Sequence, residues 1–155
     1  MIQVKDVVKS FDGNVVLNHV SADFEDGKVN MIIGQSGSGK TVLMKSMIGL
    51  HQIDGGEIVF DTRAGQQNLA GMTEKEVRML HREVGMLFQG AALFDSMTVQ
   101  ENVMYPLEMF SDMSKDEMVA RARFCLERVN MPERAFGLMP SEISGGMQKR
   151  VAIAR

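Results

Sequence analysis

Gly34-Gln35-Ser36-Gly37-Ser38-Gly39-Lys40-Thr41 is a complete phosphate-binding loop of the form G-x-x-x-x-G-K-[S/T]. The glycines let backbone N–H groups turn inward, where they can donate to a phosphate tail from several directions. Lys40 adds a positive charge that can reach the β- and γ-phosphates, and the Thr41 hydroxyl is placed to bind Mg²⁺. The stretch therefore predicts a site for ATP with Mg²⁺.

The residues on either side of this loop support the prediction. Residues 29–33 form a short, mostly apolar run, typical of a buried parallel strand that leads into the loop. The residues after the loop predict a helix, because apolar side chains recur there at helical spacing: Val42, Leu43, Met44, Met47 and Ile48. The phosphates would then lie at a helix N-terminus, where the helix dipole favours anions. The alternative is a merely flexible glycine loop, which would not require a strand before it and a helix after it.

Length and composition limit the kind of protein. At 155 residues, the chain is long enough for one domain, or for a core with a small appended lobe. Lys and Arg number 17 against 20 Asp and Glu, and the resulting charge of −3 argues against nucleic acid as the main partner. The single cysteine, Cys125, excludes an internal disulfide and lies in a helical pattern. No signal peptide or long apolar run is visible, so we expect any membrane to be reached through a partner.

Several short strands are expected before residue 90. Two strands, covering residues 2–11 and 15–20, flank the turn Asp12-Gly13-Asn14. The apolar runs at residues 57–60 and 84–88 predict two more strands, the second of them buried.

Helices dominate the second half of the chain. Residues 61–72 are polar and contain glycine, so we expect a loop there. Three capping boxes then predict helix starts: Thr73 with Glu76, Thr98 with Glu101, and Ser114 with Glu117. We expect residues 98–139 to form a helical lobe inserted into a nucleotide-binding core made of residues 1–97 and 140–155.

A second motif, Ser144-Gly145-Gly146, comes directly before a helical pattern. Two glycines after a serine expose the first amides of a helix together with a hydroxyl, which is an arrangement that binds anions. An ordinary N-cap with a tight turn would have the same residues.

With both motifs in place, the chain resembles the nucleotide-binding subunit of ATP-binding-cassette (ABC) transporters over its whole length. The family's signature is Leu-Ser-Gly-Gly-Gln; here Ile143 and Met147 stand at its ends, while the middle three residues match. The resemblance implies an α/β P-loop NTPase fold of the ABC type. Such a fold has a mainly parallel core sheet, an N-terminal antiparallel β portion and an inserted helical lobe. It also implies a head-to-tail dimer with a second ATPase subunit, in which Ser144, Gly145 and Gly146 face the γ-phosphate bound by the partner.

The resemblance assigns roles to two further residues. Gln89 corresponds to the family's Q-loop glutamine, which contacts Mg²⁺ or the attacking water; a glutamine hydrogen-bonded locally at a strand end is the alternative. Together with Lys40 it would be catalytic, and together with Thr41 it would bind the metal. Phe11 corresponds to the aromatic residue that stacks on adenine, although it could equally be part of a core.

The stretch Gln89–Val103, followed by Pro106-Leu107, looks like the same region of bacterial phospholipid or organic-solvent-resistance transporters of the lipid-asymmetry-maintenance type. This region receives the membrane subunits in such transporters, so Leu93 and Phe94 could belong to a docking surface for a permease, or pack inside the lobe. The expected function is therefore ATP-driven transport of a lipid or hydrophobic solute, on the cytoplasmic face of the cell membrane.

Two alternatives remain open. One is a soluble cassette ATPase of DNA repair, chromosome structure or the ribosome, although its usual coiled-coil insertion or tandem cassette is not seen. The other is a nucleotide-sensing module without turnover. In the family, the Walker B strand, catalytic glutamate and switch histidine follow the signature helix, in which this sequence ends at Arg155. His19, His51 and His81 all precede the signature, so we expect an N-terminal fragment, truncated after the signature helix, with negligible hydrolysis.

Overall fold

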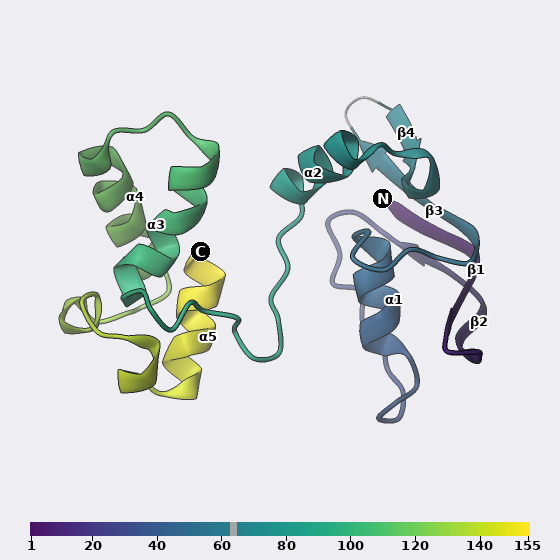
Figure 1. Cartoon of the computed structure of the whole chain (residues 1–155), viewed down its shortest axis with the longest axis horizontal. Helices are drawn as coiled ribbons and strands as arrows, with labels where there is room; N and C mark the ends of the chain where they lie inside the picture. The colour runs from purple at the N-terminus through teal and green to yellow at the C-terminus, as the bar shows by residue number, and fades with distance from the viewer. Residues whose placement is uncertain (63–64) are drawn as a thin grey trace. The chain divides into compact units, whose positions relative to one another are not determined.

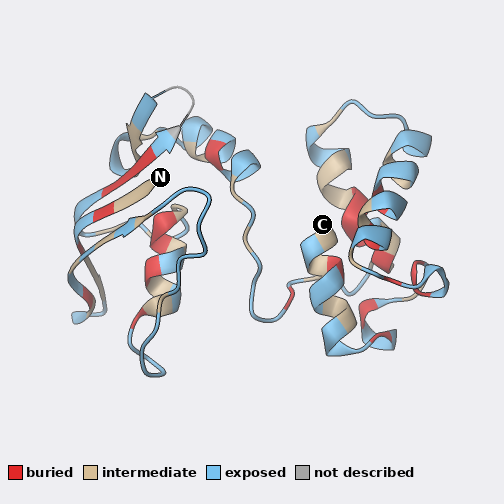
Figure 2. Cartoon of the chain, turned by 180° about the vertical axis from the view of Figure 1, so that it is seen from behind, coloured by how far each residue is buried: buried red, intermediate tan, exposed pale blue. Residues whose placement is uncertain are grey.

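The computed structural model describes residues 1–62 and 65–155, which form two compact units, Met1–Gly85 and Met86–Arg155 (Figure 1). Each unit has its own cluster of buried apolar side chains (Figure 2). The two units are described separately below.

The first unit contains a four-stranded sheet in the order β2-β1-β3-β4, in which every neighbouring pair is antiparallel. The strands are β1 (Ile2–Phe11), β2 (Asn14–Phe24), β3 (Gly55–Thr62) and β4 (Gly65–Asn68). The predicted hairpin between β1 and β2 is confirmed: its two loop residues, Asp12 and Gly13, have φ of 49° and 81°. Positive φ at both positions matches the turn geometry that suits the twist of a two-residue hairpin.

The sheet and two helices enclose the core of the first unit. The helical segments are α1 (Lys40–Met47), η1 (Leu69–Gly71) and α2 (Glu74–Glu83). Leu43 and Met47 from α1 and Leu80 from α2 are buried in one cluster with apolar residues of the strands, such as Val7 and Ile58. This packing fixes α1, and with it the loop before α1, against the sheet.

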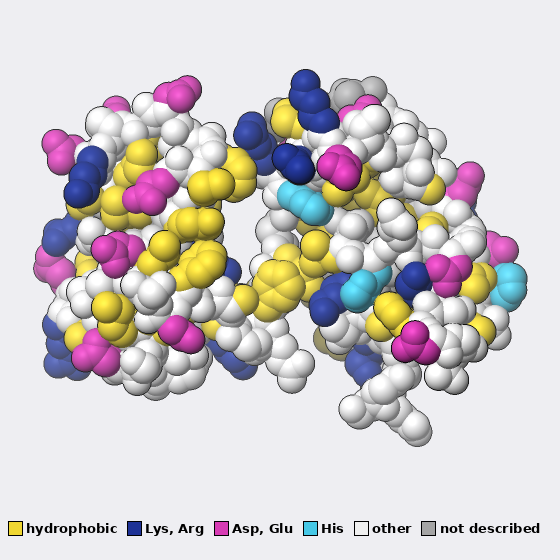
Figure 3. Space-filling model, in the orientation of Figure 1, with side chains coloured by type: hydrophobic (Ala, Val, Ile, Leu, Met, Phe, Trp, Pro, Cys, Tyr) yellow, Lys and Arg dark blue, Asp and Glu magenta, His cyan; other side chains and the backbone are white. Residues whose placement is uncertain are grey.

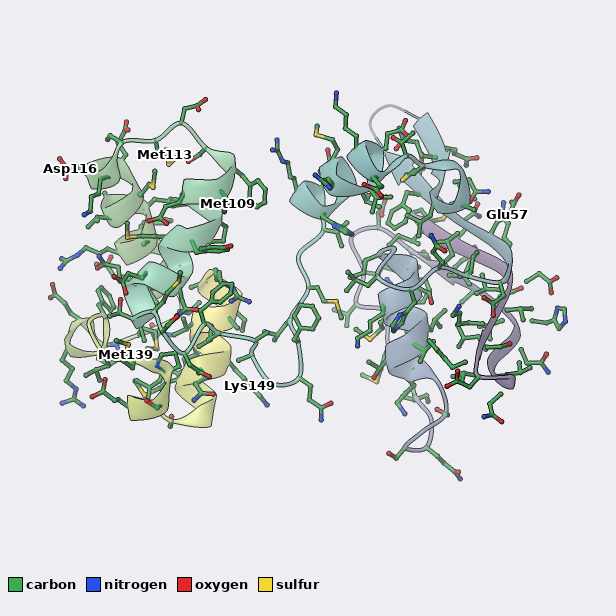
Figure 4. The ribbon with its side chains drawn as sticks, viewed as in Figure 1. Glu57, Met109, Met113, Asp116, Met139 and Lys149 are labelled. Carbon is green, nitrogen blue, oxygen red and sulfur yellow. The ribbon has the colours of Figure 1, made fainter. Side chains whose placement is uncertain are left out.

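The second unit is helical. Its segments are α3 (Val99–Phe110), α4 (Lys115–Arg128), η2 (Glu133–Ala135), η3 (Pro140–Glu142) and α5 (Gly145–Ala154). α3, α4 and α5 share a core that includes Val103, Leu126 and Val151. Exposed hydrophobic side chains are also visible on this unit (Figure 3), among them Met109 near the end of α3 and Met113 in the loop that follows (Figure 4).

All three predicted capping boxes are confirmed. Thr73, Thr98 and Ser114 each accept a backbone N–H three residues later, and the glutamate at that position accepts the N–H of the cap. These short-range signals depend on four consecutive residues, so the sequence alone specifies them.

The parallel part of the predicted sheet is not formed by the described residues. The predicted strands 29–33 and 84–88 are not strands, and Val29 and Ile33 are 95% and 83% exposed. A strand is stabilised by ladder hydrogen bonds to a neighbour, and no strand in residues 1–62 and 65–155 pairs with either segment. The prediction of two buried strands from these apolar patterns is therefore wrong for the described structure, because pairing decides whether such a segment becomes a strand.

The predicted loop over residues 61–72 is also wrong for most of its length. Part of it is β4 and η1, while residues 63–64 of this prediction lie outside the described residues. β4 could not be predicted from apolar alternation, because Gln66 and Gln67 are polar. The strand lies at the edge of the sheet and, among the described strands, pairs only with β3.

The boundary between the compact units differs from the expected domain limits. The units divide after Gly85 rather than after Met97, and residues 140–155 pack with the helices of 98–139 through Ile143 and Val151. A nucleotide-binding core made of residues 1–97 and 140–155 therefore stays a prediction.

Candidate nucleotide-binding site

The loop Gly34–Thr41 lies directly before and within the first turn of α1. Gly37 and Gly39 have φ of 82° and 87°, in the left-handed region that L-residues rarely adopt. A Cβ on Gly39 would also lie 3.0 Å from the Val16 carbonyl oxygen and 3.1 Å from Leu17 Cδ2. Both the backbone conformation and the contact with β2 therefore require glycine at position 39.

The loop curls around the side chain of Lys40. Lys40 Nζ donates to the carbonyl oxygens of Gly34 and Gln35, at 2.8 and 2.6 Å. Lys40 is the first residue of α1, so the N–H groups of the first helical turn follow directly after the loop. The loop thus combines a mobile positive charge with the positive end of a helix dipole.

These residues fit a triphosphate with Mg²⁺. The first turn of α1 contains no acidic residue that would repel phosphate, and Thr41 is exposed. A Cβ on Gly34 would come 2.8 Å from Ser38 Oγ, a contact that rotation of the serine hydroxyl would relieve. Among residues 1–62 and 65–155, no group of three or more His, Cys, Asp or Glu could hold a metal ion. The hydroxyl of Thr41 remains the predicted protein ligand for Mg²⁺ in this unit.

Phe11 lies at the end of β1 and is 38% exposed, so one predicted possibility, a fully buried core phenylalanine, is not what the structure shows. Its ring makes an edge contact with His51, with centroids 5.4 Å apart, and Lys9 Nζ is 5.1 Å from the ring centroid. Lys9 is in turn held by Asp54 at 2.8 Å. The hydrogen bond from Lys9, together with that from the Ser10 N–H, lowers the pKa of Asp54.

His51, Lys9 and Asp54 were not predicted as neighbours of Phe11. Lys9 and Asp54 are 45 residues apart, and no local motif links them. The turn residues Asp54-Gly55-Gly56 indicate that a strand begins there, so the sequence places Asp54 next to the sheet. It does not indicate that Asp54 pairs with Lys9.

An open cavity of about 590 Å³ also lies in the first unit. It is lined by residues that follow α1 and by residues of η1 and α2, including His51, Ile53, Leu69 and Val77. None of the predicted site residues lines it.

The second unit contains the other predicted site residues. Gln89 is exposed and lies in a turn between the extended segment 84–88 and α3. Ser144 is the N-cap of α5, and its Oγ accepts the Met147 N–H at 3.3 Å. Gly145 and Gly146 are exposed in the first turn, so their N–H groups have the predicted arrangement of hydroxyl and helix amides.

The structure therefore brings the predicted residues together in two groups. Gly34–Thr41 and Phe11 belong to the first unit, and Gln89 and Ser144–Gly146 to the second. Their roles in binding stay predictions.

A family model described as ABC transporter matches residues 17–155. This chain belongs to the ABC transporter family. The cassette shares 36% identity over 155 residues with the methionine import ATP-binding protein MetN of Rhizobium johnstonii, covering 100% of the chain and 41% of the relative. It shares 37% identity over 155 residues with the glutamine transport ATP-binding protein GlnQ of Escherichia coli, covering 100% and 62%.

A third relative is Protein TRIGALACTOSYLDIACYLGLYCEROL 3, chloroplastic, of Arabidopsis thaliana, which is 37% identical over 155 residues, covering 100% of the chain and 43% of the relative. The cassette thus spans about half the length of the curated relatives it matches.

Solved cassettes have the same fold. The ATP-binding cassette MJ0796, in a dimeric post-hydrolysis state bound to ADP and Pi, gives a TM-score of 0.88 at 30% identity, covering 99% of this chain and 68% of that one. The cbiO1 cassette from Clostridium perfringens gives 0.81 at 26% identity, covering 99% and 59%. These matches confirm the ABC-type P-loop NTPase fold with an N-terminal antiparallel sheet and helices.

Within the described parts of the cassette, no helix combines the length and the apolar character needed to span a bilayer.

Proposed function

We propose that this chain is the nucleotide-binding part of a transporter ATPase that couples ATP binding and hydrolysis to transport by a partner permease. The observation that carries the proposal is the loop Gly34–Thr41, in which Gly37 and Gly39 have left-handed φ and the Lys40 ammonium is held inside the loop by the Gly34 and Gln35 carbonyls.

Each residue of the loop has a role in this proposal. Lys40 reaches the β- and γ-phosphates, the N–H groups of residues 34–41 donate to phosphate oxygens, and Thr41 binds Mg²⁺ through its hydroxyl. Bound Mg²⁺ supplies charge neutralisation on the phosphates. The exposed ring of Phe11 stacks on adenine.

The site is completed by a second subunit. Two copies pack head to tail, so that Ser144, Gly145 and Gly146 of one copy face the γ-phosphate bound to the other, and Gln89 contacts Mg²⁺ or the attacking water. The solved MJ0796 cassette is described as dimeric, which supports this arrangement.

In this proposal the ATPase binds to an integral-membrane permease at the cytoplasmic face of the cell membrane. We place permease docking at residues 89–103. Of the two apolar residues singled out there, Leu93 packs against the helical core, whereas Phe94 is 40% exposed and contacts Tyr105. Phe94 is therefore the better candidate for contact with a partner.

The transported substrate in this proposal is a lipid or another hydrophobic solute. The resemblance of residues 89–107 to lipid-asymmetry transporters supports it, as does a relative named after a galactolipid. Small polar solutes are the second candidate, because other relatives are named for methionine, glutamine and spermidine/putrescine. Stimulation of ATP hydrolysis in the reconstituted transporter by phospholipid, and not by these solutes, would distinguish the two.

Binding of Mg-ATP to this chain tests the proposal directly. Lys40→Ala should abolish binding, measured by titration calorimetry, because the charge facing the β- and γ-phosphates is lost. Lys45→Ala is the matched control, since Lys45 lies in the last turn of the same helix. Circular dichroism should show that both variants keep the fold. Equal affinity of Lys40→Ala and the unsubstituted chain for Mg-ATP would refute the proposed role of the loop.

A further inference from the structure

The residues that follow Gln89 form a strained turn. Ala91 and Ala92 have φ of 60° and 52°, a conformation that is uncommon for residues other than glycine. Ala91 is only 3% exposed, and its N–H donates to the Phe88 carbonyl oxygen at 3.0 Å. Consecutive alanines persist in this conformation only where neighbouring groups stabilise it.

One of these neighbouring groups is the side chain of Arg155. Its Nη1 donates to the Ala92 carbonyl oxygen at 2.7 Å, and its guanidinium carbon lies 5.9 Å from the ring centroid of Phe94. A guanidinium combines a directed hydrogen bond with a flat face that stacks on an aromatic ring. Arg155 therefore contacts the turn at two points, Ala92 and Phe94.

The far end of the same turn is held by Asn102 of α3. Asn102 is completely buried; its Oδ1 accepts the Phe94 N–H at 2.8 Å, and its Nδ2 donates to the carbonyl oxygens of Phe94 and Met97, both at 3.1 Å. With Phe94 fixed by α3, the contact from Arg155 restrains the chain between Phe94 and Gln89, in addition to the backbone bonds from Ala91 to Phe88 and from Ala92 to Gly90.

Arg155 also links this turn to the signature motif. It follows the last residue of α5, and its N–H donates to the carbonyl oxygen of Val151, which is fully buried. The N-cap of α5 is Ser144, and ten helical residues span about 15 Å. The segment Ser144–Arg155 thus carries the signature residues at its start and, about three helical turns later, the contact with the Gln89 turn.

We propose that Arg155 is a positioning residue that holds Gln89 in place through the Ala92 carbonyl and couples the Gln89 turn to the signature helix. This inference rests on the proposed function, since Gln89 and Ser144 have their roles there. Arg155 acts through the turn, and its effect is on the placement of Gln89.

The test uses Arg155→Met and Arg155→Lys in the full-length protein that carries this sequence. Arg155→Met should lower kcat for ATP by about tenfold or more while changing KM less than about threefold, because a misplaced group near the reacting atoms affects the reaction more than binding. Arg155→Lys should recover much of kcat, since an ammonium can donate to the Ala92 oxygen. Hydrogen exchange of residues 88–94 should accelerate in Arg155→Met.

Arg123→Met is the matched control. Arg123 donates to Glu133 at 3.0 Å and lies 5.8 Å from the Phe136 ring centroid, so it makes the same two types of contact in the same unit without contacting the turn. It should leave kcat and exchange of residues 88–94 unchanged.

Failure of the inference about Arg155 can be distinguished from failure of the proposed function. Equal kcat in Arg155→Met and the unsubstituted protein would overturn the inference, as would equal losses in Arg155→Met and Arg123→Met. If Arg155→Met does not fold, Arg155→Ala takes its place, and a folded Arg155→Ala whose kcat and local exchange equal those of Arg123→Met would overturn the inference as well. Absence of ATP hydrolysis by the unsubstituted full-length protein would instead refute the proposed function.

Discussion

Glycine at position 39 shows how a single residue can be fixed by two independent requirements. Its φ of 87° is a left-handed conformation, and the space where a Cβ would lie is occupied by Val16 and Leu17 of β2. Gly37 has a similar φ but open space around it. The phosphate loop was predicted from its residue pattern alone, whereas the contact between Gly39 and β2 could not be, because it joins residues more than twenty positions apart.

Gly39→Ala should therefore destabilise the chain by at least about 1 kcal/mol, the order of the cost of a left-handed alanine, and weaken Mg-ATP binding by displacing the loop. Chemical denaturation and titration calorimetry would measure the two effects. Gly71→Ala is the control, since a Cβ there meets nothing within 4 Å. If the two variants lost the same stability and affinity, the geometric argument for Gly39 would be wrong.

At the level of elements, helix starts were predicted well and strands less well. The capping boxes at Thr73, Thr98 and Ser114 are local, so four residues suffice to specify them. Strands depend on partners: residues 29–33 and 84–88 have apolar patterns but no described partner, and β4 has a partner but no apolar pattern. The spacing of apolar residues indicates which face of a segment could be buried. It does not indicate which strand the segment pairs with, because pairing depends on the whole sheet.

The capping boxes also predict a pH dependence. The hydrogen bond from the Thr98 N–H, followed by that from its hydroxyl, lowers the pKa of Glu101 below the ordinary 4.5. A carboxylate with a lowered pKa stabilises the fold above its unfolded-state pKa, and this contribution is lost as the pH falls through the folded-state pKa. Helicity should therefore decrease below about pH 4.5.

Glu101→Gln should reduce this sensitivity, because an amide oxygen can accept the same bonds without titrating. Circular dichroism at 222 nm during acid titration would show it. Glu108→Gln, on the exposed part of the same helix, is the control. An unaltered acid transition in Glu101→Gln would show that this box does not contribute to the pH dependence.

At the level of the whole molecule, the family was predictable because each of its two motifs is a contiguous stretch of sequence. The phosphate loop and the Ser144-Gly145-Gly146 motif are separated by about a hundred residues, which is also typical of the family. The match over residues 17–155 and the fold agreement with MJ0796 confirm it. The division into units after Gly85 was not predictable, since Ile143 and Val151 share a core with α3, which begins more than forty residues before Ile143. Long-range packing of this kind leaves no local signal in the sequence.

ATP hydrolysis requires several groups from different parts of a cassette to be positioned together. We propose that this chain binds Mg-ATP but hydrolyses it negligibly by itself. A version extended by the next hundred or so residues should hydrolyse ATP at least about tenfold faster, because hydrolysis needs a water-orienting base and a carboxylate that supports Mg²⁺. A phosphate-release assay measures both rates, and equal rates would contradict the proposal that the hydrolysing residues lie outside this sequence.

The polar edge strand β4 has a consequence for solubility. β3 contains Ile58, Val59 and Phe60 in succession, and an unpaired edge of such a strand is a template for intermolecular sheet formation. β4 pairs with residues 59–62 of β3, is only four residues long, and presents Gln66 and Gln67 near that edge. This short glutamine-bearing strand therefore acts as a gatekeeper against aggregation on the β3 side of the sheet.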